Sequence, residues 1–454
     1  MLTILLLLAC SGSPTQPPEV QPAPVERPTD VIVITLDTTR ADHLGTYGYY
    51  RETSPRLDRF AATSLVFDRF IVPMATTLPT HMSLWTGVWP TEHGIEANVM
   101  HGGKAFVPSP GLSSLAQILQ TEGYATGAFV SAAPLDDQSG ALEGFGHHTQ
   151  PKRYERPAEQ TTNDALAWLG EQDGPMLMWV HYYDPHNPFR APEAYTDLFD
   201  PNDARVSTWM TERNISPVAK RPTGQKVRAK PSIHGYDAEI RYMDDQFGRL
   251  LEGLEMSGRL GNALVVVMGD HGEGLNQHDQ PAHGLVWNEQ LHAPLFIKAP
   301  GVLPERVAAI TSAADVFPTA LALVDLPGET TFMKQVSGRD VRATTDKRPV
   351  LSQTSRRQLE FGQPLTYALT GERYKCTMVE GQPAVLFDLE TDPFELAPMS
   401  ESSELAACQA ELTRTLEAQR ARATALGSGQ TTDVDADRMD ELRELGYLDD
   451  EPAN

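Results

Sequence analysis

Short apolar runs rich in β-branched residues alternate along this chain with segments of helical periodicity, and this alternation limits the fold more than any other feature. Apolar residues recur at helical spacing over 114–122 and 236–256, and the apolar runs predict strands at 31–36, 125–130, 176–180, 263–268 and 295–298. Strands separated by helices build a largely parallel sheet covered on both faces. We therefore predict an α/β fold with a mostly parallel central sheet and helices on both faces.

Three of the predicted strands run into acidic or histidine side chains. Asp37 follows the strand at 31–36, Asp184 comes shortly after the strand at 176–180, and Asp270 with His271 follows the strand at 263–268. In open parallel sheets, ligands bind at the carboxyl ends of the strands. The sequence therefore predicts a site at that edge of the sheet.

The predicted segments become shorter after about residue 345. Segments 365–369, 375–379 and 385–389 predict a small antiparallel sheet, and Leu and Ala recur at helical spacing over 404–425, with a second short amphipathic stretch at 439–448. We predict one large domain over 30–344 and a small C-terminal α+β subdomain over 345–454. Residues 195–230 are polar and rich in Pro, Lys and Arg, which predicts a surface excursion: either a solvated insertion or one wall of a cleft.

The N-terminus has the features of an export signal. Residues 1–9 are almost entirely apolar, and Leu7-Leu8-Ala9-Cys10 has the form of a bacterial lipobox, which predicts a lipoprotein signal peptide over 1–10 with lipid on Cys10. An ordinary secretory signal is the alternative. Residues 11–29 are rich in Pro and predict an extended linker. We expect a protein outside the cytoplasm, lipid-anchored to a bacterial membrane in the periplasm or at the cell surface.

The charge balance excludes one class of partner. The chain has 37 Lys and Arg residues against 61 Asp and Glu residues, a formal net charge of −24, and such a surface repels nucleic acid. The three cysteines, Cys10, Cys376 and Cys408, are too few for a disulfide scaffold or a Cys-rich zinc module. If this acidic protein acts on an anion, positive potential has to be supplied locally, and a metal ion is the simplest source.

Four side chains have the chemistry for such a metal site. Asp37, Asp270 and His271 offer the two oxygens and one nitrogen that a divalent metal binds. Thr77 precedes Leu78-Pro79-Thr80, which suits a strand-to-helix turn, so its hydroxyl is predicted beside a helix N-terminus that favours an anion. A hydroxyl on a metal has a lowered pKa and is a usable nucleophile at neutral pH.

Several segments in fixed order resemble the sulfatase family of the alkaline phosphatase superfamily over roughly residues 30–450. These are Ile34–Gly45, Ser54–Asp58, Leu78–Gly94, Asp184–Pro188, Tyr236–Gly248, Met268–Glu273 and Phe387–Pro393. The resemblance implies an alkaline-phosphatase-like fold and a divalent metal, Ca²⁺ in sulfatases, held by Asp37, Asp270 and His271. It also places Thr77 at the nucleophile position and implies that His186 and His283 contact the transferred group or the leaving group.

The departures from the family pattern bear on the chemistry. Sulfatases carry Cys or Ser where Thr77 stands and convert it to formylglycine, which is not expected from threonine. A threonine ester cannot release sulfate by elimination, so a second in-line attack by water is needed, as in phosphoesterases. His81 replaces the usual Arg and is expected to bind substrate, and Thr38 replaces a metal-binding Asp. The Thr-x-Pro-x-His pattern resembles the nucleotide pyrophosphatase/phosphodiesterase branch, which makes Zn²⁺ or Mn²⁺ plausible.

A second metal is an open alternative. Asp184, His186 and His283 have the chemistry to hold it, which would give a two-metal site. Otherwise Asp184 binds substrate and the two histidines only hydrogen-bond it, as in one-metal sulfatases.

The sequence therefore predicts a metal-dependent hydrolase of sulfate or phosphate esters with Thr77 as nucleophile. Its substrate is an anionic ester of a glycan, a lipid or a small molecule. One alternative is a phosphodiesterase or a phosphoethanolamine-type transferase. An alternative of another class is a catalytically inactive lipoprotein that binds glycans or anions.

Overall fold

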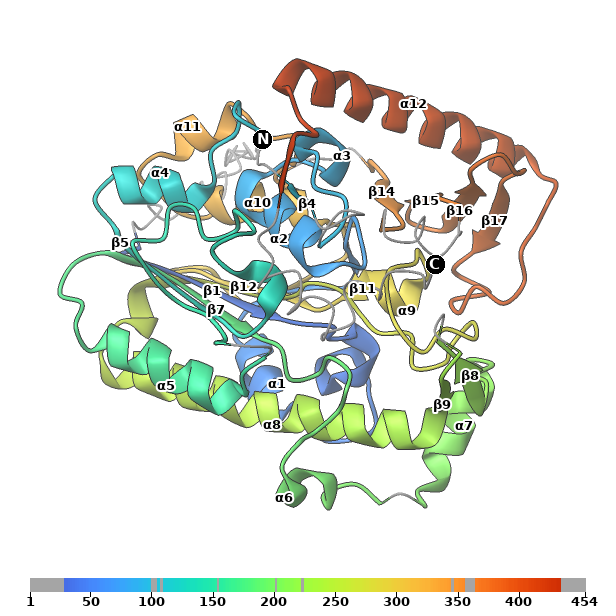
Figure 1. Ribbon diagram of the computed structural model, residues 1–454, viewed down its shortest axis with the longest axis horizontal. Helices are drawn as coiled ribbons and strands as arrows, with labels where there is room; N and C mark the ends of the chain where they lie inside the picture. The colour runs from blue at the N-terminus through green and yellow to red at the C-terminus, as the bar shows by residue number, and fades with distance from the viewer. Residues whose placement is uncertain are drawn as a thin grey trace, which may run out of the picture.

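The computed structural model describes residues 28–98, 104–106, 109–152, 155–200, 202–221, 224–343, 347–355 and 364–433 (Figure 1). The predicted signal peptide, nearly all of the linker and the amphipathic stretch at 439–448 lie outside these residues. Within them, no helix combines the length and apolar character that crossing a membrane requires.

The strand predicted at 31–36 lies in the middle of an eight-stranded sheet. This strand, β1 (Asp30–Leu36), pairs in parallel with β10 (Ala263–Gly269) and with β7 (Met176–Tyr182). Beyond β7 the sheet continues in parallel through β5 (Ala125–Val130) and β6 (His147–Thr149). Beyond β10 lie β12 (Leu295–Lys298), β2 (Leu65–Phe67) and β13 (Glu305–Val307), with β12 antiparallel to both of its neighbours. The prediction of a mostly parallel sheet is confirmed.

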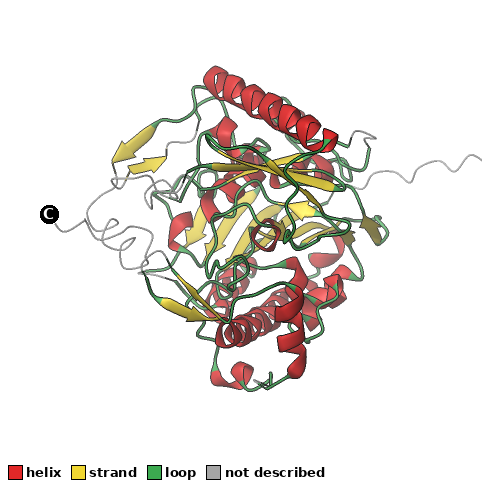
Figure 2. Cartoon of the chain, turned by 90° about the vertical axis from the view of Figure 1, so that its right-hand side faces the viewer, coloured by secondary structure: helices red, strands yellow, loops and turns green. Residues whose placement is uncertain are grey.

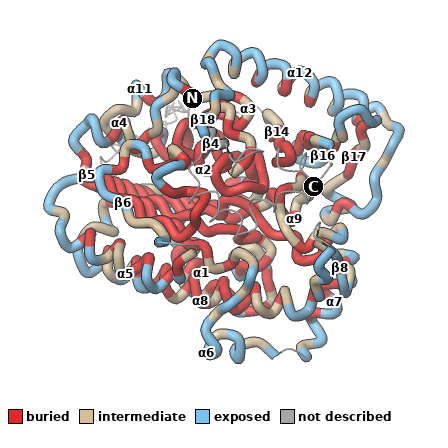
Figure 3. The backbone as a smooth tube through the Cα atoms, in the orientation of Figure 1, coloured by how far each residue is buried: buried red, intermediate tan, exposed pale blue. Residues whose placement is uncertain are grey.

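Helices cover both faces of this sheet, as predicted. Side chains of β1 alternate between two cores: Val31 and Val33 contribute to one, and Ile32 and Ile34 to the other. The first core includes residues of α2 (Thr77–Thr86), α4 (Leu115–Thr121) and α10 (Ala313–Leu321), and the second includes residues of α1 (Pro55–Ala61), α5 (Ala158–Leu169) and α8 (Ala229–Met256). The central strands are the most continuously buried part of the chain because both faces are covered (Figure 3).

The long helix begins earlier than predicted. The pattern indicated a start at Tyr236, but α8 starts at Ala229, seven residues before it. Pro231 lies in the first turn, where backbone N–H groups have no partner inside a helix, so proline is tolerated there. The predicted excursion at 195–230 is an insertion with short elements of its own: α6 (Glu193–Thr196), α7 (Ala204–Glu212), and the hairpin of β8 (Val218–Lys220) and β9 (Lys226–Arg228).

The predicted small antiparallel sheet is present near the C-terminus. It consists of β14 (Val350–Gln353), β15 (Thr366–Thr370), β16 (Tyr374–Val379) and β17 (Val385–Asp388). The helix α12 (Ser403–Leu426) lies across this sheet, as Figure 2 shows, and buries Leu405, Leu412 and Leu416 against it. A disulfide between Cys376 and Cys408 joins β16 to α12. The exact domain boundary at residue 345 stays a prediction.

Short elements complete the described chain. They are β3 (Phe70–Ile71), which pairs with β11 (His292–Ala293); β4 (Lys104–Phe106), which pairs with β18 (Thr431–Asp433); and the helices α3 (Pro90–His93), α9 (Asn288–Leu291) and α11 (Glu329–Met333). Four 3-10 turns lie at Ala41–His43, Gly45–Tyr47, Ala133–Leu135 and Leu260–Asn262.

Candidate active site

The register of the central strands brings the predicted metal ligands together. Leu36 of β1 pairs with Gly269 of β10, so the next residues, Asp37 and Asp270, lie side by side at the carboxyl edge of the sheet. Asp37, Asp270 and His271 each offer one ligand atom within 4.8 Å of the other two, and all three side chains are fully buried. The structure therefore brings the three predicted ligands together, and metal binding by them stays a prediction.

The two carboxylates are short of partners. Asp270 accepts hydrogen bonds through Oδ1 from the backbone N–H of Thr38 at 3.0 Å and of His271 at 2.7 Å. Its Oδ2 and both oxygens of Asp37 are buried without a hydrogen-bond partner among the described residues. Burial, followed by the charge of Glu273, raises the pKa of Asp37 well above its usual range. Burial and the charge of Asp37 do the same to the pKa of Asp270, so the ionised pair requires a compensating cation.

His271 directs a ring nitrogen toward the carboxylates of Asp37 and Asp270. Its Nδ1 lies 2.9 Å from the carbonyl oxygen of Gly272, which can only accept, so Nδ1 carries the hydrogen and Nε2 is bare. Nε2 lies 3.7 Å from Oδ2 of Asp270 and 3.4 Å from Oγ1 of Thr77. A histidine that donates its other ring N–H to a carbonyl is typical of metal ligands.

Thr77 lies where the sequence predicts it. It is the first residue of α2, it is fully buried, and its hydroxyl faces His271. The positive end of the helix dipole therefore lies beside Oγ1, and the N–H of Leu78 at this helix start is paired with Oδ1 of Asn98 at 2.9 Å. Two carboxylate oxygens, one imidazole nitrogen and one hydroxyl fit a divalent cation, and the orphaned buried oxygens of Asp37 and Asp270 support this fit.

The two histidines predicted to contact substrate are brought together beside this group. Nε2 of His186 lies 3.3 Å from Nε2 of His283, and the ring of His283 lies 4.4 Å from that of His271. Nδ1 of His186 lies 2.6 Å from the carbonyl oxygen of Asn187, and Nδ1 of His283 lies 3.0 Å from the carbonyl oxygen of Ala75. Carbonyl oxygens only accept, so both Nδ1 atoms carry a hydrogen, and the contact between the two Nε2 atoms is a hydrogen bond when one of the rings is an imidazolium.

Asp184 is not among the clustered ligand atoms, whereas Nδ1 of His81 lies 3.9 Å from Oδ2 of Asp270. Asp184 accepts from the backbone N–H of Ala158 at 2.9 Å through Oδ1 and so caps the start of α5. Burial is the first cause that raises its pKa to about 7. His81 is fully buried within α2, where its Nδ1 binds the carbonyl of Thr77 at 2.8 Å. Substrate binding by either residue stays a prediction.

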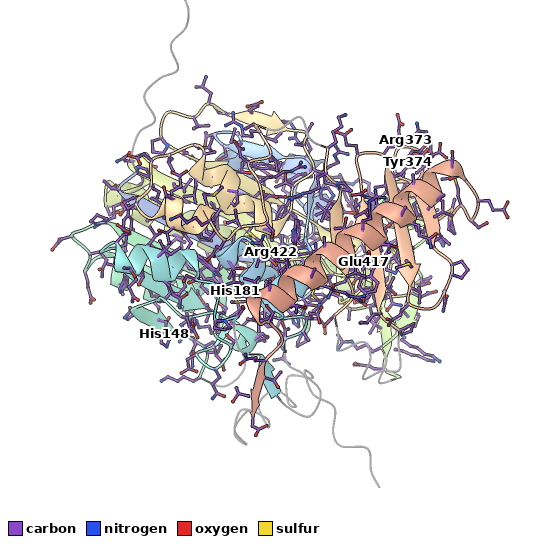
Figure 4. All side chains as sticks on the ribbon, turned by 90° about the horizontal axis from the view of Figure 1, so that it is seen from above. His148, His181, Arg373, Tyr374, Glu417 and Arg422 are labelled. Atoms are coloured by element: carbon purple, nitrogen blue, oxygen red, sulfur yellow. A yellow bond between two sulfur atoms is a disulfide. The ribbon has the colours of Figure 1, made fainter. Side chains whose placement is uncertain are left out.

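One buried residue next to the cluster was not selected from the sequence. His181 lies within β7, which extends past the predicted strand end, and its Nε2 is 3.3 Å from Oδ2 of Asp37 (labelled in Figure 4). Its Nδ1 lies 3.0 Å from Oγ1 of Thr35, which accepts the indole N–H of Trp179 at 2.9 Å. What brings His181 to the site is the parallel register of β1 and β7, in which Thr35 pairs with His181. That pairing is a property of the fold and not of the local sequence pattern.

Comparison with known families now decides the assignment of the chain. The model of the Sulfatase family matches residues 29–326. The chain belongs to the sulfatase family. A similar protein is the ulvan-active sulfatase of Formosa agariphila, 25% identical over 427 residues, which cover 84% of this chain and 79% of the relative. The protein is thus an enzyme of the ester-hydrolase class.

Solved structures agree on the fold of this sulfatase. The phosphonate monoester hydrolase of Agrobacterium radiobacter superposes with a TM-score of 0.65 at 21% identity, covering 87% of this chain and 96% of that chain. A protein of the alkaline phosphatase superfamily from Vibrio parahaemolyticus gives a TM-score of 0.63 at 15% identity, covering 89% and 90%. The predicted alkaline-phosphatase-like fold is confirmed.

Proposed function

We propose that this sulfatase-family protein hydrolyses sulfate or phosphate esters with Thr77 as the nucleophile and with a divalent metal held by Asp37, Asp270, His271 and Thr77. The observation that carries the proposal is the position of the Thr77 hydroxyl. It lies at the start of α2, 3.4 Å from the bare Nε2 of His271 and beside two buried, uncompensated carboxylates. When bound, the metal supplies positive charge that lowers the pKa of the hydroxyl and neutralises the carboxylates.

The chain's own residues account for the remaining chemistry. Oγ1 of Thr77 loses its proton to solvent, attacks the sulfur or phosphorus and forms a threonine ester, while the bond to the leaving oxygen breaks. That oxygen takes a proton from the imidazolium form of His186 or His283. Water then attacks the ester in line, regenerates Thr77 and releases sulfate or phosphate. A threonine ester has no elimination route, so this mechanism favours phosphate and phosphonate esters over sulfate esters.

Turnover by Thr77 variants tests this mechanism. We expect Thr77→Ala to lower kcat/KM by about a thousandfold or more with every ester that the enzyme cleaves, and Thr77→Ser to keep a measurable part of it. Thr121→Ala, on the exposed side of α4, is the matched control. The assay compares 4-nitrophenyl sulfate, 4-nitrophenyl phosphate and a phosphodiester in the presence of Zn²⁺, Ca²⁺ or Mn²⁺. Ester cleavage that survives Thr77→Ala contradicts the proposal. Transfer to a glycan instead of water identifies a transferase.

As an alternative to this acid role, we propose that His186 and His283 hold a second metal ion, in which case solvent protonates the leaving oxygen. Their Nε2 atoms lie 3.3 Å apart and each Nδ1 faces a carbonyl, so either a proton or a metal ion between the two rings accounts for the contact. Metal analysis at saturating Zn²⁺ is expected to give two ions per chain in the wild type and one in the double variant His186→Ala/His283→Ala. One ion in both proteins means that the two histidines share a proton instead.

Finally, we propose that the enzyme acts outside the cytoplasm, anchored through lipid on Cys10. The disulfide between Cys376 and Cys408 supports an oxidising compartment. In the producing bacterium, radioactive palmitate is expected to label the wild type and not Cys10→Ser. Labelling of neither protein contradicts the anchor.

A further inference from the structure

A cavity of about 910 Å³ opens beside His186. Its walls come from the segment 155–159 before and within α5, from the loop 183–192 after β7, and from α8. The contacts run in order from Thr77 to His271, His283 and His186, and His186 lines the cavity. In an in-line displacement the leaving group departs on the side opposite the nucleophile. The cavity is therefore placed to receive the leaving group.

The charge of this cavity is acidic. Four carboxylates line it, from Glu155, Glu159, Asp184 and Glu239, against the guanidinium groups of Arg156 and Arg190. The charge of Arg156 is already used, because Nη1 contacts Asp164 at 2.5 Å and Nη2 contacts Thr149 at 2.8 Å. Arg190 and Glu159 are exposed, whereas Glu239 is only 4% exposed, so carboxyl groups line the buried part of the wall.

The acidic wall contains an oxygen with no partner. Oδ1 of Asp184 caps α5, but its Oδ2 is buried and has no hydrogen-bond partner among the described residues. Glu239 accepts the backbone N–H of Arg190, and no ion pair of Glu239 or Asp184 is present among the described residues.

The same cavity has aromatic walls. The rings of Tyr183 and Tyr242 line it, and the Tyr183 ring is stacked on His186 with centroids 4.4 Å apart. The carboxylates are also spread too widely for a metal ion. Among the described residues, the group with ligand atoms at metal spacing is Asp37, Asp270 and His271. Aromatic faces together with separated carboxylates bind an organic ammonium group through cation–π and charge contacts.

We propose that the ester substrate carries a positively charged amine or quaternary ammonium on its leaving group, which occupies this cavity and faces Glu239 and Asp184. The inference rests on the proposed ester hydrolysis and adds the class of leaving group. The proposal disfavours substrates with a polyanionic leaving group, because the carboxyl groups that line the cavity would not bind it. The carrier of the ammonium group is an amino alcohol or an amino sugar.

Matched esters test the charge directly. Choline phosphate and 3,3-dimethylbutyl phosphate have leaving groups of nearly the same shape, one cationic and one neutral, and the corresponding sulfates form a second pair. We expect kcat/KM to be at least about tenfold higher for the choline ester, because one compensated buried charge is worth about that factor. Glu239→Gln is expected to reduce this ratio about tenfold, whereas Glu255→Gln, on the exposed side of the same helix, keeps it. A wild-type ratio near one, or a ratio that Glu239→Gln leaves unchanged, overturns the proposal.

Binding separates this proposal from the proposed hydrolysis. If none of the esters is cleaved, the hydrolysis proposal fails, and titration calorimetry then compares free choline with 3,3-dimethylbutanol on the wild-type protein. Stronger binding of choline that Glu239→Gln weakens about tenfold supports the cavity as an ammonium site. Equal binding of the two alcohols, or no binding of either, overturns it.

Discussion

His181 illustrates how a single buried residue can act on a proposed metal ligand. Its Nε2 lies 3.3 Å from Oδ2 of Asp37, and on its other side Nδ1 contacts Thr35, whose hydroxyl oxygen accepts the indole N–H of Trp179. Residues that contact a metal ligand in this way fix its orientation and contribute about 10–100-fold to metal affinity. We expect His181→Phe to raise the dissociation constant for Zn²⁺ or Mn²⁺ at least tenfold and His181→Gln to restore part of the loss.

The control for this prediction is a histidine away from the site. His148 is exposed on β6, so His148→Phe is expected to leave metal affinity unchanged (Figure 4). Calorimetry with each metal measures the affinity, and thermal unfolding of the metal-free proteins shows whether each variant is folded. A folded His181→Phe protein with wild-type metal affinity would show that Asp37 is held without the imidazole.

At the scale of elements, Asp244 joins two helices on one face of the sheet. It lies in α8 and accepts the backbone N–H groups of Arg56 and Leu57 at the start of α1, at 2.9 Å and 2.8 Å. Burial raises its pKa from 3.8 to about 7, despite these hydrogen bonds. The folded state therefore binds the proton more tightly than the unfolded state. This contribution to stability is complete below pH 3.8 and is lost as the pH rises through about 7.

We therefore expect Asp244→Asn to remove a part of the pH dependence of unfolding. The free energy of unfolding of the wild type should fall relative to that of the variant between pH 5 and pH 8. The full loss over three pKa units is about 4 kcal/mol at most. Urea denaturation at both pH values measures the difference, with Asp245→Asn on the same helix as control. Parallel pH profiles for wild type and Asp244→Asn would contradict the assignment.

The disulfide is the other element-scale connection. It closes a loop with a sequence separation of 32 between β16 and α12. A loop of that length restricts the unfolded chain enough to stabilise the fold by about 3–4 kcal/mol. We expect dithiothreitol to lower the stability of the wild type and to have no effect on Cys376→Ala/Cys408→Ala. Reduction of the bond, verified by mass spectrometry, with no change in stability would refute this prediction.

The strands and helices around the site also show which of its residues could be predicted from the sequence. Strand ends place Asp37, Asp270 and His271 correctly, because a buried parallel strand has a recognisable apolar run and a polar end. The pattern does not tell which strand is the neighbour of β1, so His181, which depends on the register with Thr35, was missed. Side-chain direction is equally hidden: Asp184 follows its strand as predicted, yet it turns to the start of α5. Pairing of Cys376 with Cys408 required the fold as well.

At the scale of the whole molecule, the net charge of the protein repels the anionic substrate that the proposed site has to bind. The chain carries a net charge of −24, and the proposed reaction requires an anionic ester to approach it. Long-range repulsion of this kind lowers the rate of encounter, and salt weakens it, because the Debye length falls from about 30 Å at 0.01 M to about 8 Å at 0.15 M. In the proposed site, attraction comes from short-range contacts of the substrate with the metal and the histidines.

This contrast predicts an unusual response to salt. We expect kcat/KM for 4-nitrophenyl phosphate to rise a few-fold between about 0.01 M and 0.15 M NaCl, because screening removes a repulsion and leaves the buried contacts unaffected. Choline phosphate carries a compensating positive charge, so its kcat/KM should rise less and serves as the internal control. Initial rates at fixed pH and fixed metal concentration measure both. A fall of kcat/KM with salt for the aryl phosphate would contradict this prediction. It would mean that basic side chains near the entrance attract the substrate more strongly than the net charge of the molecule repels it.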